Sequence, residues 1–218
     1  MHLGPPRSLL ALAAPPLCGV CGSACDAAAP LCAACERELS DAGPVFGTGP
    51  PGVNLAVAAA PYEGAARELA HALKYGRLLA LAEVCAGLIV AACPAHELAG
   101  SVVPVPPSGR RWRWRGFDPA EEIALALAKR TGLPAHACLR RLPGPRQVGR
   151  PRRERLSDPP RVELRGHAPR SALLIDDVHT TGATLAACAA ALRGGGSRRV
   201  VALTLARSGA PIRAQPPA

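Results

Sequence analysis

Residues 172–185 read Ala-Leu-Leu-Ile-Asp-Asp-Val-His-Thr-Thr-Gly-Ala-Thr-Leu, and most of the expected architecture follows from this segment. Its first four residues are apolar and end on β-branched Ile175, a pattern typical of a parallel strand buried on both faces. An alanine- and leucine-rich helix is expected from about Ala183 to Arg193, and a second strand over Val200–Leu205. Strand, turn, helix and strand make one βαβ unit. The turn therefore lies at the carboxyl edge of a parallel sheet, where such folds bind ligands.

The turn itself has the chemistry of an anion site followed by a helix. Gly182 lets backbone N–H groups approach an anion, and the positive end of the helix dipole favours phosphate. Two carboxylates precede it and would repel a bare phosphate, so they suit the hydroxyls of a sugar or a metal ion. A ligand with a ribose diol and a 5′-phosphate fits this order. The alternative is an acidic strand end whose side chains only cap a helix. The candidate residues are Asp176, Asp177, Thr180, Thr181, Gly182, Ala183 and Thr184.

The composition restricts the class of protein but does not choose a ligand. A chain of 218 residues is long enough for one sizeable core and a small appendage. The net charge is +10, and 24 of the 26 basic residues are arginine, whose planar fork binds phosphate oxygens in pairs. This excess suits a polyanionic small molecule or nucleic acid, and codon bias explains it equally well. No apolar run reaches the length of a membrane span, and the apolar segment after Arg7 is short for a secretory signal, so a cytoplasmic protein is expected.

Near the amino terminus the cysteines have the spacing of a metal site. The two C-x-x-C pairs, separated by ten residues, are Cys18 with Cys21 and Cys32 with Cys35. Four thiolates complete a tetrahedral structural zinc site, which would hold together a segment that has almost no apolar core of its own. Disulfide bonds are the alternative, and they are less common in a reducing compartment. Cys25 lies inside the same segment and leaves the ligand set open.

A Gly/Pro-rich stretch at 44–52 divides the chain into a zinc-finger-like unit at 1–50 and a larger domain at 51–218. Lys74 closes a predicted helix, where a solvated lysine is expected; the alternative is that Lys74 reaches the ligand pocket. The further elements expected in the larger domain are strands at 55–60 and 102–107 and helices at 63–74, 78–92 and 119–131.

Two basic segments follow strands of the larger domain. The first, at 108–118, alternates arginine with tryptophan, and Arg111 and Arg115 are the candidates for holding a pyrophosphate. The same alternation suits single-stranded DNA, by stacking and phosphate contact. The second segment, at 139–165, is rich in arginine and lacks periodicity, so it is expected to be a mobile loop that acts as a lid over a charged substrate or is disordered.

Taken together, these motifs resemble the ComF family of phosphoribosyltransferase-like proteins. The resemblance rests on the C-x-x-C pairs, on Leu73-Lys74-Tyr75, on Val103 to Pro106 with the Arg-Gly-Phe at 115–117, on Gln147-Val148-Gly149 and on Asp176 to Thr184. It implies an α/β fold: a Rossmann-like type I phosphoribosyltransferase core with a parallel sheet, behind a small four-Cys zinc module. In this chain Asp118-Pro119 replaces the usual Asn-Gln, so the catalytic detail of that loop is uncertain.

The resemblance also implies a function. Phosphoribosyl pyrophosphate (PRPP) would bind with Mg²⁺, with its ribose at Asp176 and Asp177 as the catalytic pair, its 5′-phosphate at 180–184 and its pyrophosphate at Arg111 and Arg115. The family is associated with DNA uptake and competence and with nucleoside chemistry, and its acceptor substrate is not implied. The alternative is a non-catalytic accessory factor that binds single-stranded DNA and interacts with competence or DNA-processing proteins. An oligomer is compatible with either function. No residue stands out as a general base, and His179 is expected to be a solvent-facing turn residue.

Overall fold

The fold is built around one central sheet, seen in a computed structural model that describes residues 16–26, 29–75, 80–107, 116–143 and 160–209. The strand order is β1-β2-β7-β6-β3. Neighbouring strands pair in parallel except β1 and β2, which are antiparallel. An α/β fold with a mostly parallel sheet is therefore confirmed. The strands are β1 (Val45–Gly47), β2 (Leu55–Pro61), β3 (Ser101–Pro104), β6 (Ser171–His179) and β7 (Arg199–Arg207).

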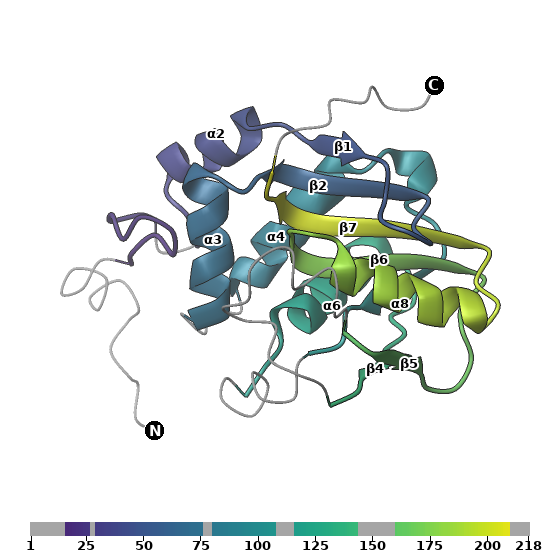
Figure 1. Cartoon of the computed structure of the whole chain (residues 1–218). Helices are drawn as coiled ribbons and strands as arrows, with labels where there is room; N and C mark the ends of the chain where they lie inside the picture. Colours follow the sequence, from purple (N-terminus) through teal and green to yellow (C-terminus); the bar gives the residue numbers. More distant parts are fainter. Residues whose placement is uncertain (1–15, 27–28, 76–79, 108–115, 144–159, 210–218) are drawn as a thin grey trace.

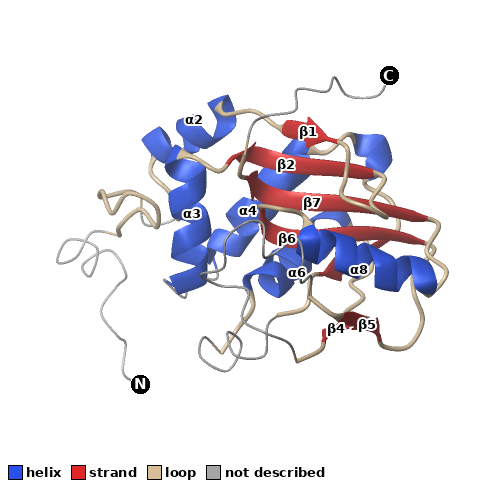
Figure 2. Cartoon of the chain, viewed as in Figure 1, coloured by secondary structure: helices blue, strands red, loops and turns tan. Residues whose placement is uncertain are grey.

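Helices cover both faces of this sheet (Figure 2). On β6, Leu173 and Ile175 pack into a cluster with α3, α4 and α6, whereas Ala172 and Leu174 pack into a second cluster with α8. This division follows from the alternation of side chains along a strand, and it explains why every position from Ala172 to Ile175 is apolar. The helices are α2 (Ala33–Asp41), α3 (Gly64–Tyr75), α4 (Ala80–Ala92), α6 (Pro119–Thr131) and α8 (Ala183–Gly194), with a short 3₁₀ turn η1 (Ala95–Glu97).

The predicted βαβ unit is confirmed, with one correction to its first strand. β6 and β7 pair in parallel from Ser171 opposite Arg199 to His179 opposite Arg207. The sequence pattern ended the first strand at Ile175, but the strand continues for four residues past it. The backbone pairing with β7 persists there although the side chains have become polar. The acidic pair is therefore part of the strand.

Two helices carry residues to the carboxyl edge of the sheet. α6 begins at the expected Pro119 and is capped by Asp118, whose Oδ1 accepts hydrogen bonds from the N–H groups of Ala120 (3.0 Å) and Glu121 (3.3 Å). Figure 1 shows α3 standing beside the ends of the central strands, with α2 against its upper end. The side chain of Glu38 on α2 accepts a hydrogen bond from the Ala65 N–H of α3 at 2.8 Å. α3 is therefore tied to the amino-terminal segment at its first turn.

The basic segment at 139–165 is not a loop at its two ends. β4 (Leu139–Arg141) and β5 (Val162–Leu164) form a two-stranded antiparallel sheet, and Leu139 is buried against the α8 side of the core. Arg140 donates from Nε to Glu163 across the pair at 2.6 Å. Each strand has only three residues, too few for an alternating pattern to be detected. Residues 144–159 lie outside the described residues, so the lid over a charged substrate remains a prediction.

Val45 to Gly47 fall within the predicted amino-terminal unit, and they form the edge strand of the central sheet beside β2. The predicted division at residue 50 remains a prediction. In the part of the chain that the structure describes, no helix combines the length and the apolar character that a membrane crossing needs.

Candidate functional site

The acidic pair lies near the carboxyl end of β6. Asp176 is opposite Thr204 of β7 in the parallel register, and its Oδ1 accepts a hydrogen bond from the Asp177 N–H at 2.9 Å. Burial raises the pKa of Asp176 well above its usual range, and the charge of Asp177 raises it further. Burial and the neighbouring charge therefore both disfavour the ionised form of Asp176.

Asp177 has a partner that the sequence did not reveal. The Nζ of Lys74, in the last turn of α3, lies 2.8 Å from Asp177 Oδ2. The two side chains are only 21% and 14% exposed, so the expected solvated lysine at this helix end is a wrong prediction. Burial alone would lower the pKa of Lys74, but the charge and the hydrogen bond of Asp177 outweigh it, and the net shift is upward. Lys74 is therefore cationic and fixed at the acidic pair.

A third carboxyl group completes this cluster. Asp118, the N-cap of α6, is close enough to Asp177 for the two charges to interact. Burial raises the pKa of Asp118 to about 6, the hydrogen bonds from the first turn of α6 oppose that rise, and the charge of Asp177 adds to it. The carboxylate that replaces asparagine at this position is therefore partly protonated near neutral pH, and it uses Oδ1 to cap the helix.

The threonine turn is built as the sequence predicts, between the end of β6 and the start of α8. Gly182 has a left-handed φ of 75° and occupies the N-cap position of α8, where no side chain caps the helix. Thr181 Oγ1 accepts a long hydrogen bond of 3.4 Å from the Ala183 N–H. Thr180 is exposed, and Thr181 and Thr184 are half-buried. The turn thus presents hydroxyl groups and the amino end of a 12-residue helix to the same side as the strand end.

Behind this turn lies a pair of basic residues, which the sequence analysis missed. His179 is 6% exposed, so the expected solvent-facing role is wrong. Burial lowers the pKa of His179 to about 4, and the charge of Arg207 contributes to the shift. The Nη1 atom of Arg207 is buried and has no hydrogen-bond partner in the structure. The signal for His179 was available, because apolar Val178 continues the strand beyond the two aspartates.

Pro50 and His179 together enclose Gly182. A Cβ at position 182 would lie 3.0 Å from His179 Nε2 and 3.0 Å from Pro50 Cβ. A side chain there would therefore meet both a strained backbone conformation and crowded surroundings. Pro50 belongs to the Gly/Pro-rich stretch that the sequence analysis treated only as a boundary, and it forms part of the wall of the turn.

The two pyrophosphate candidates are not part of the described structure. Arg111 and Arg115 fall in residues 108–115, which lie outside the described residues, and their role remains a prediction. The strand that leads to them is present, since Val105 donates its N–H to Ile175 O at 2.9 Å. Its neighbour in the sheet is the acidic strand β6.

The four predicted cysteine ligands come together near the amino end of the described chain. The Sγ atoms of Cys18, Cys21, Cys32 and Cys35 all lie within 4.8 Å of one another. Tetrahedral zinc with Zn–S bonds of about 2.3 Å requires sulfur atoms about 3.8 Å apart, and Cys21 and Cys32 are separated by 3.6 Å. All nine cysteines are free, so none forms a disulfide. The four cysteines are therefore close enough to bind a structural metal ion such as zinc.

The electrostatics of the cluster and the place of Cys25 support the same ligand set. A side-chain hydrogen bond from Ser23 is the main reason why the pKa of Cys21 falls to about 6, so this thiol ionises readily. Cys25 lies outside the cluster, and its Sγ contacts the carbonyl oxygens of Ala29 at 3.3 Å and Pro16 at 3.5 Å. The question that the sequence left open is settled in favour of the two C-x-x-C pairs.

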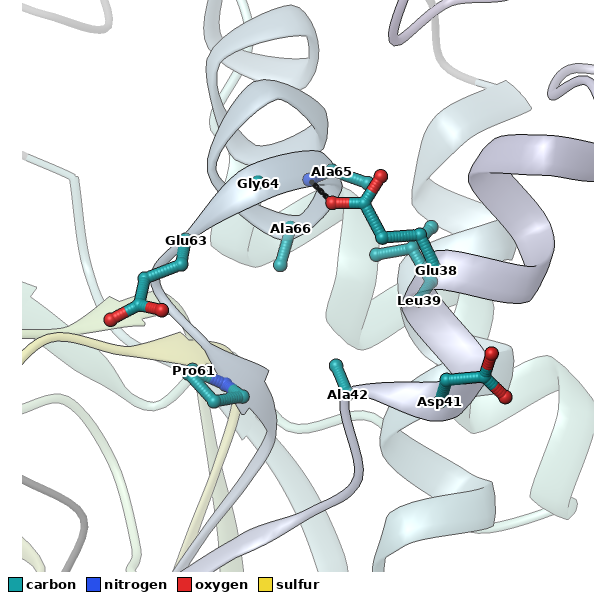
Figure 3. A pocket seen from close by; sticks show the side chains of 9 residues that line it. All are labelled: Glu38, Leu39, Asp41, Ala42, Pro61, Glu63, Gly64, Ala65 and Ala66. Carbon is teal, nitrogen blue, oxygen red and sulfur yellow. Dashed lines mark hydrogen bonds between the residues drawn. The ribbon is translucent and has the colours of Figure 1, made fainter.

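A separate hollow of about 690 Å³ lies between α2 and the start of α3 (Figure 3). Its acidic lining residues are Glu38, Asp41 and Glu63. Gly64 and Ala65, from the first turn of α3, also line it, whereas Lys74 lies in the last turn of the same helix. The hollow includes none of the predicted ligand residues, and it is distinct from the acidic strand end.

The comparisons with known proteins assign the chain to no family. No protein-family model matches it, and no curated protein matches it.

Proposed function

We propose that this protein binds PRPP, or a closely related phosphoribosyl ligand, in the manner of a ComF-like phosphoribosyltransferase. The observation that carries the proposal is the placement of Asp177 on β6 together with the threonine turn that leads into α8. A carboxylate recognises a diol, and an uncapped helix start with hydroxyl groups recognises a phosphate monoester. Ribose 5-phosphate carries the two groups at opposite ends of one small ring.

In this proposal, different side chains bind different parts of the ligand. Thr180, Thr181 and Thr184 would surround the 5′-phosphate with the N–H groups of Ala183 and the following residues. The guanidinium of Arg207, whose Nη1 atom is buried, adds positive charge behind the turn. Asp177 would accept hydrogen bonds from the ribose hydroxyls. Arg111 and Arg115 are proposed to hold the pyrophosphate.

The acidic pair is poorly suited to direct Mg²⁺ ligation. Asp176 has a raised pKa, and Asp177 is already paired with the ammonium of Lys74. Mg²⁺ prefers several charged oxygen ligands and keeps much of its water, and a diphosphate offers such oxygens by itself. We infer that Mg²⁺ arrives bound to the pyrophosphate of the ligand. The structural ion of the four-cysteine cluster is proposed to be Zn²⁺, as the all-sulfur donor set favours.

Transfer of the phosphoribosyl group, as the resemblance implies, would pass through a transition state with positive charge on the ribose ring. The ionised carboxylate of Asp177 stabilises such charge electrostatically. His179 is enclosed and its pKa is lowered to about 4, which makes it a poor general base at the turn. An acceptor that needs no deprotonation by the protein is therefore favoured, and product analysis with nucleobases, ammonia and glutamine tests this directly.

Calorimetry with Asp177→Asn tests the binding proposal. The wild type is titrated with PRPP, ribose 5-phosphate and a 5′-nucleoside monophosphate, each with and without Mg²⁺. Asparagine keeps the shape but removes the charge, so we expect PRPP affinity to fall by about tenfold or more, because hydrogen bonds to charged groups contribute about 1.5–3 kcal/mol. The loss for the monophosphate should be similar, because it carries the same ribose diol.

Single-stranded DNA is titrated alongside as the competing ligand class. Tight, salt-dependent DNA binding with no PRPP binding by the folded wild type would contradict the proposal and favour the accessory role. PRPP binding that Asp177→Asn leaves unchanged would place the pocket elsewhere.

A further inference from the structure

Lys74 is the one cation recorded at the acidic pair among the described residues. Its ammonium group has three N–H donors, and the contact to Asp177 Oδ2 at 2.8 Å uses one of them. Asp177 has a second oxygen, which stays available to an external donor. The pair can therefore contact one ligand through two different groups, an acceptor on Asp177 and a donor on Lys74.

The stereochemistry of PRPP explains why a cation beside Asp177 would favour binding of this ligand. PRPP is an α-anomer, and its diphosphate on C1 lies on the same face of the ribose ring as the two hydroxyl groups. A carboxylate that binds the diol is therefore brought close to a diphosphate of the same charge sign, and the two repel each other. A cation between them removes this repulsion and adds a charge-assisted hydrogen bond. Lys74, 2.8 Å from Asp177, is the cation that the structure places beside this carboxylate.

We propose that Lys74 is the residue that makes the site selective for a ligand bearing a diphosphate beside its diol. The inference rests on the proposed function. It goes further by naming the residue that discriminates PRPP from ribose 5-phosphate and 5′-nucleoside monophosphates. Ribose 5-phosphate and 5′-nucleoside monophosphates carry the diol and the phosphate but no diphosphate on that face, so they gain nothing from Lys74.

The test is the ratio of the dissociation constants for ribose 5-phosphate and PRPP, at fixed ionic strength and Mg²⁺ concentration. Lys74→Met keeps the length of the side chain and removes its charge. We expect this ratio to fall by about tenfold or more, the equivalent of one charge-assisted hydrogen bond. Lys129→Met is the matched control, since Lys129 is the other lysine of the chain and its side chain is 80% exposed on α6. Its ratio should stay at the wild-type value.

A second comparison keeps the test valid if Lys74→Met folds poorly because Asp177 is left without its partner. Asp177→Asn and the double variant Lys74→Met/Asp177→Asn both lack that unpaired charge. Asp177→Asn should retain a stronger preference for PRPP than the double variant. A ratio within twofold of wild type in folded Lys74→Met, or equal ratios in the last two variants, overturns the inference while the proposed function stands. A wild type that binds no PRPP overturns both.

Discussion

Gly182 offers a quantitative test of the phosphate turn, because the chain contains a matched glycine elsewhere. Gly182 and Gly132 have nearly the same left-handed φ, 75° and 73°. Gly132 ends α6, and a Cβ there would have no neighbour within 4 Å, whereas a Cβ on Gly182 would lie 3.0 Å from His179 and from Pro50. Alanine substitution therefore introduces the same backbone strain at both positions and crowding at only one.

The magnitudes separate the two contributions. A non-glycine residue in the left-handed region costs about 1–2 kcal/mol, so Gly132→Ala should lower the free energy of unfolding by that amount. Gly182→Ala should lose about 1–3 kcal/mol more, the usual cost of forcing an extra methyl into a packed site. Urea denaturation of both variants and the wild type measures the difference. Calorimetry should show weaker phosphate and PRPP binding only for Gly182→Ala. Equal losses of stability with unchanged binding would refute both the crowding and the role of the turn.

Two further predictions concern the cysteine cluster and His179. Purified protein should carry about one equivalent of zinc by elemental analysis, and Cys21→Ser should lose it while Cys25→Ser keeps it; less than about half an equivalent in the wild type would count against the site. His179 has a pKa of about 4 in the fold, below its ordinary value of 6.5, so between these pH values the unfolded chain binds more protons. Stability from this residue is therefore complete above pH 6.5 and decreases toward pH 4. Lowering the pH from 7.5 to 4.5 should cost the wild type about 2–3 kcal/mol that His179→Gln does not lose. Parallel unfolding curves for the two proteins at both pH values would disprove the buried neutral imidazole.

Much of the fold was predictable because it depends on local patterns. The apolar run before Asp176 and the helix after Gly182 predict the βαβ unit, and Asp118-Pro119 predicts the start of α6. The C-x-x-C spacing predicts which four thiols meet. In each case the information lies within a few residues of the feature.

The contacts that sequence reasoning missed join residues far apart in the chain. Lys74 meets Asp177 because α3 stands beside the ends of the strands, and nothing within one turn of Lys74 indicates that position. One signal was available, since a chain with 24 arginines uses lysine at only two places, and arginine does not replace a compact ammonium in a small buried site. Arg207 and Pro50 likewise reach the turn from separate parts of the chain.

α3 contacts both the amino-terminal segment that carries the cysteine cluster and the acidic pair on β6. At its first turn the Ala65 N–H donates to Glu38 of α2, the helix that begins one residue after Cys32 and contains Cys35. At its last turn Lys74 binds Asp177. A cysteine cluster that holds α2 in place therefore also limits where α3, and with it the cation at the acidic pair, can lie. Leu31 and Leu39 of the amino-terminal segment are buried in the same core cluster as α3, so a metal ion in the cysteine cluster would add to packing that already holds α2 against α3.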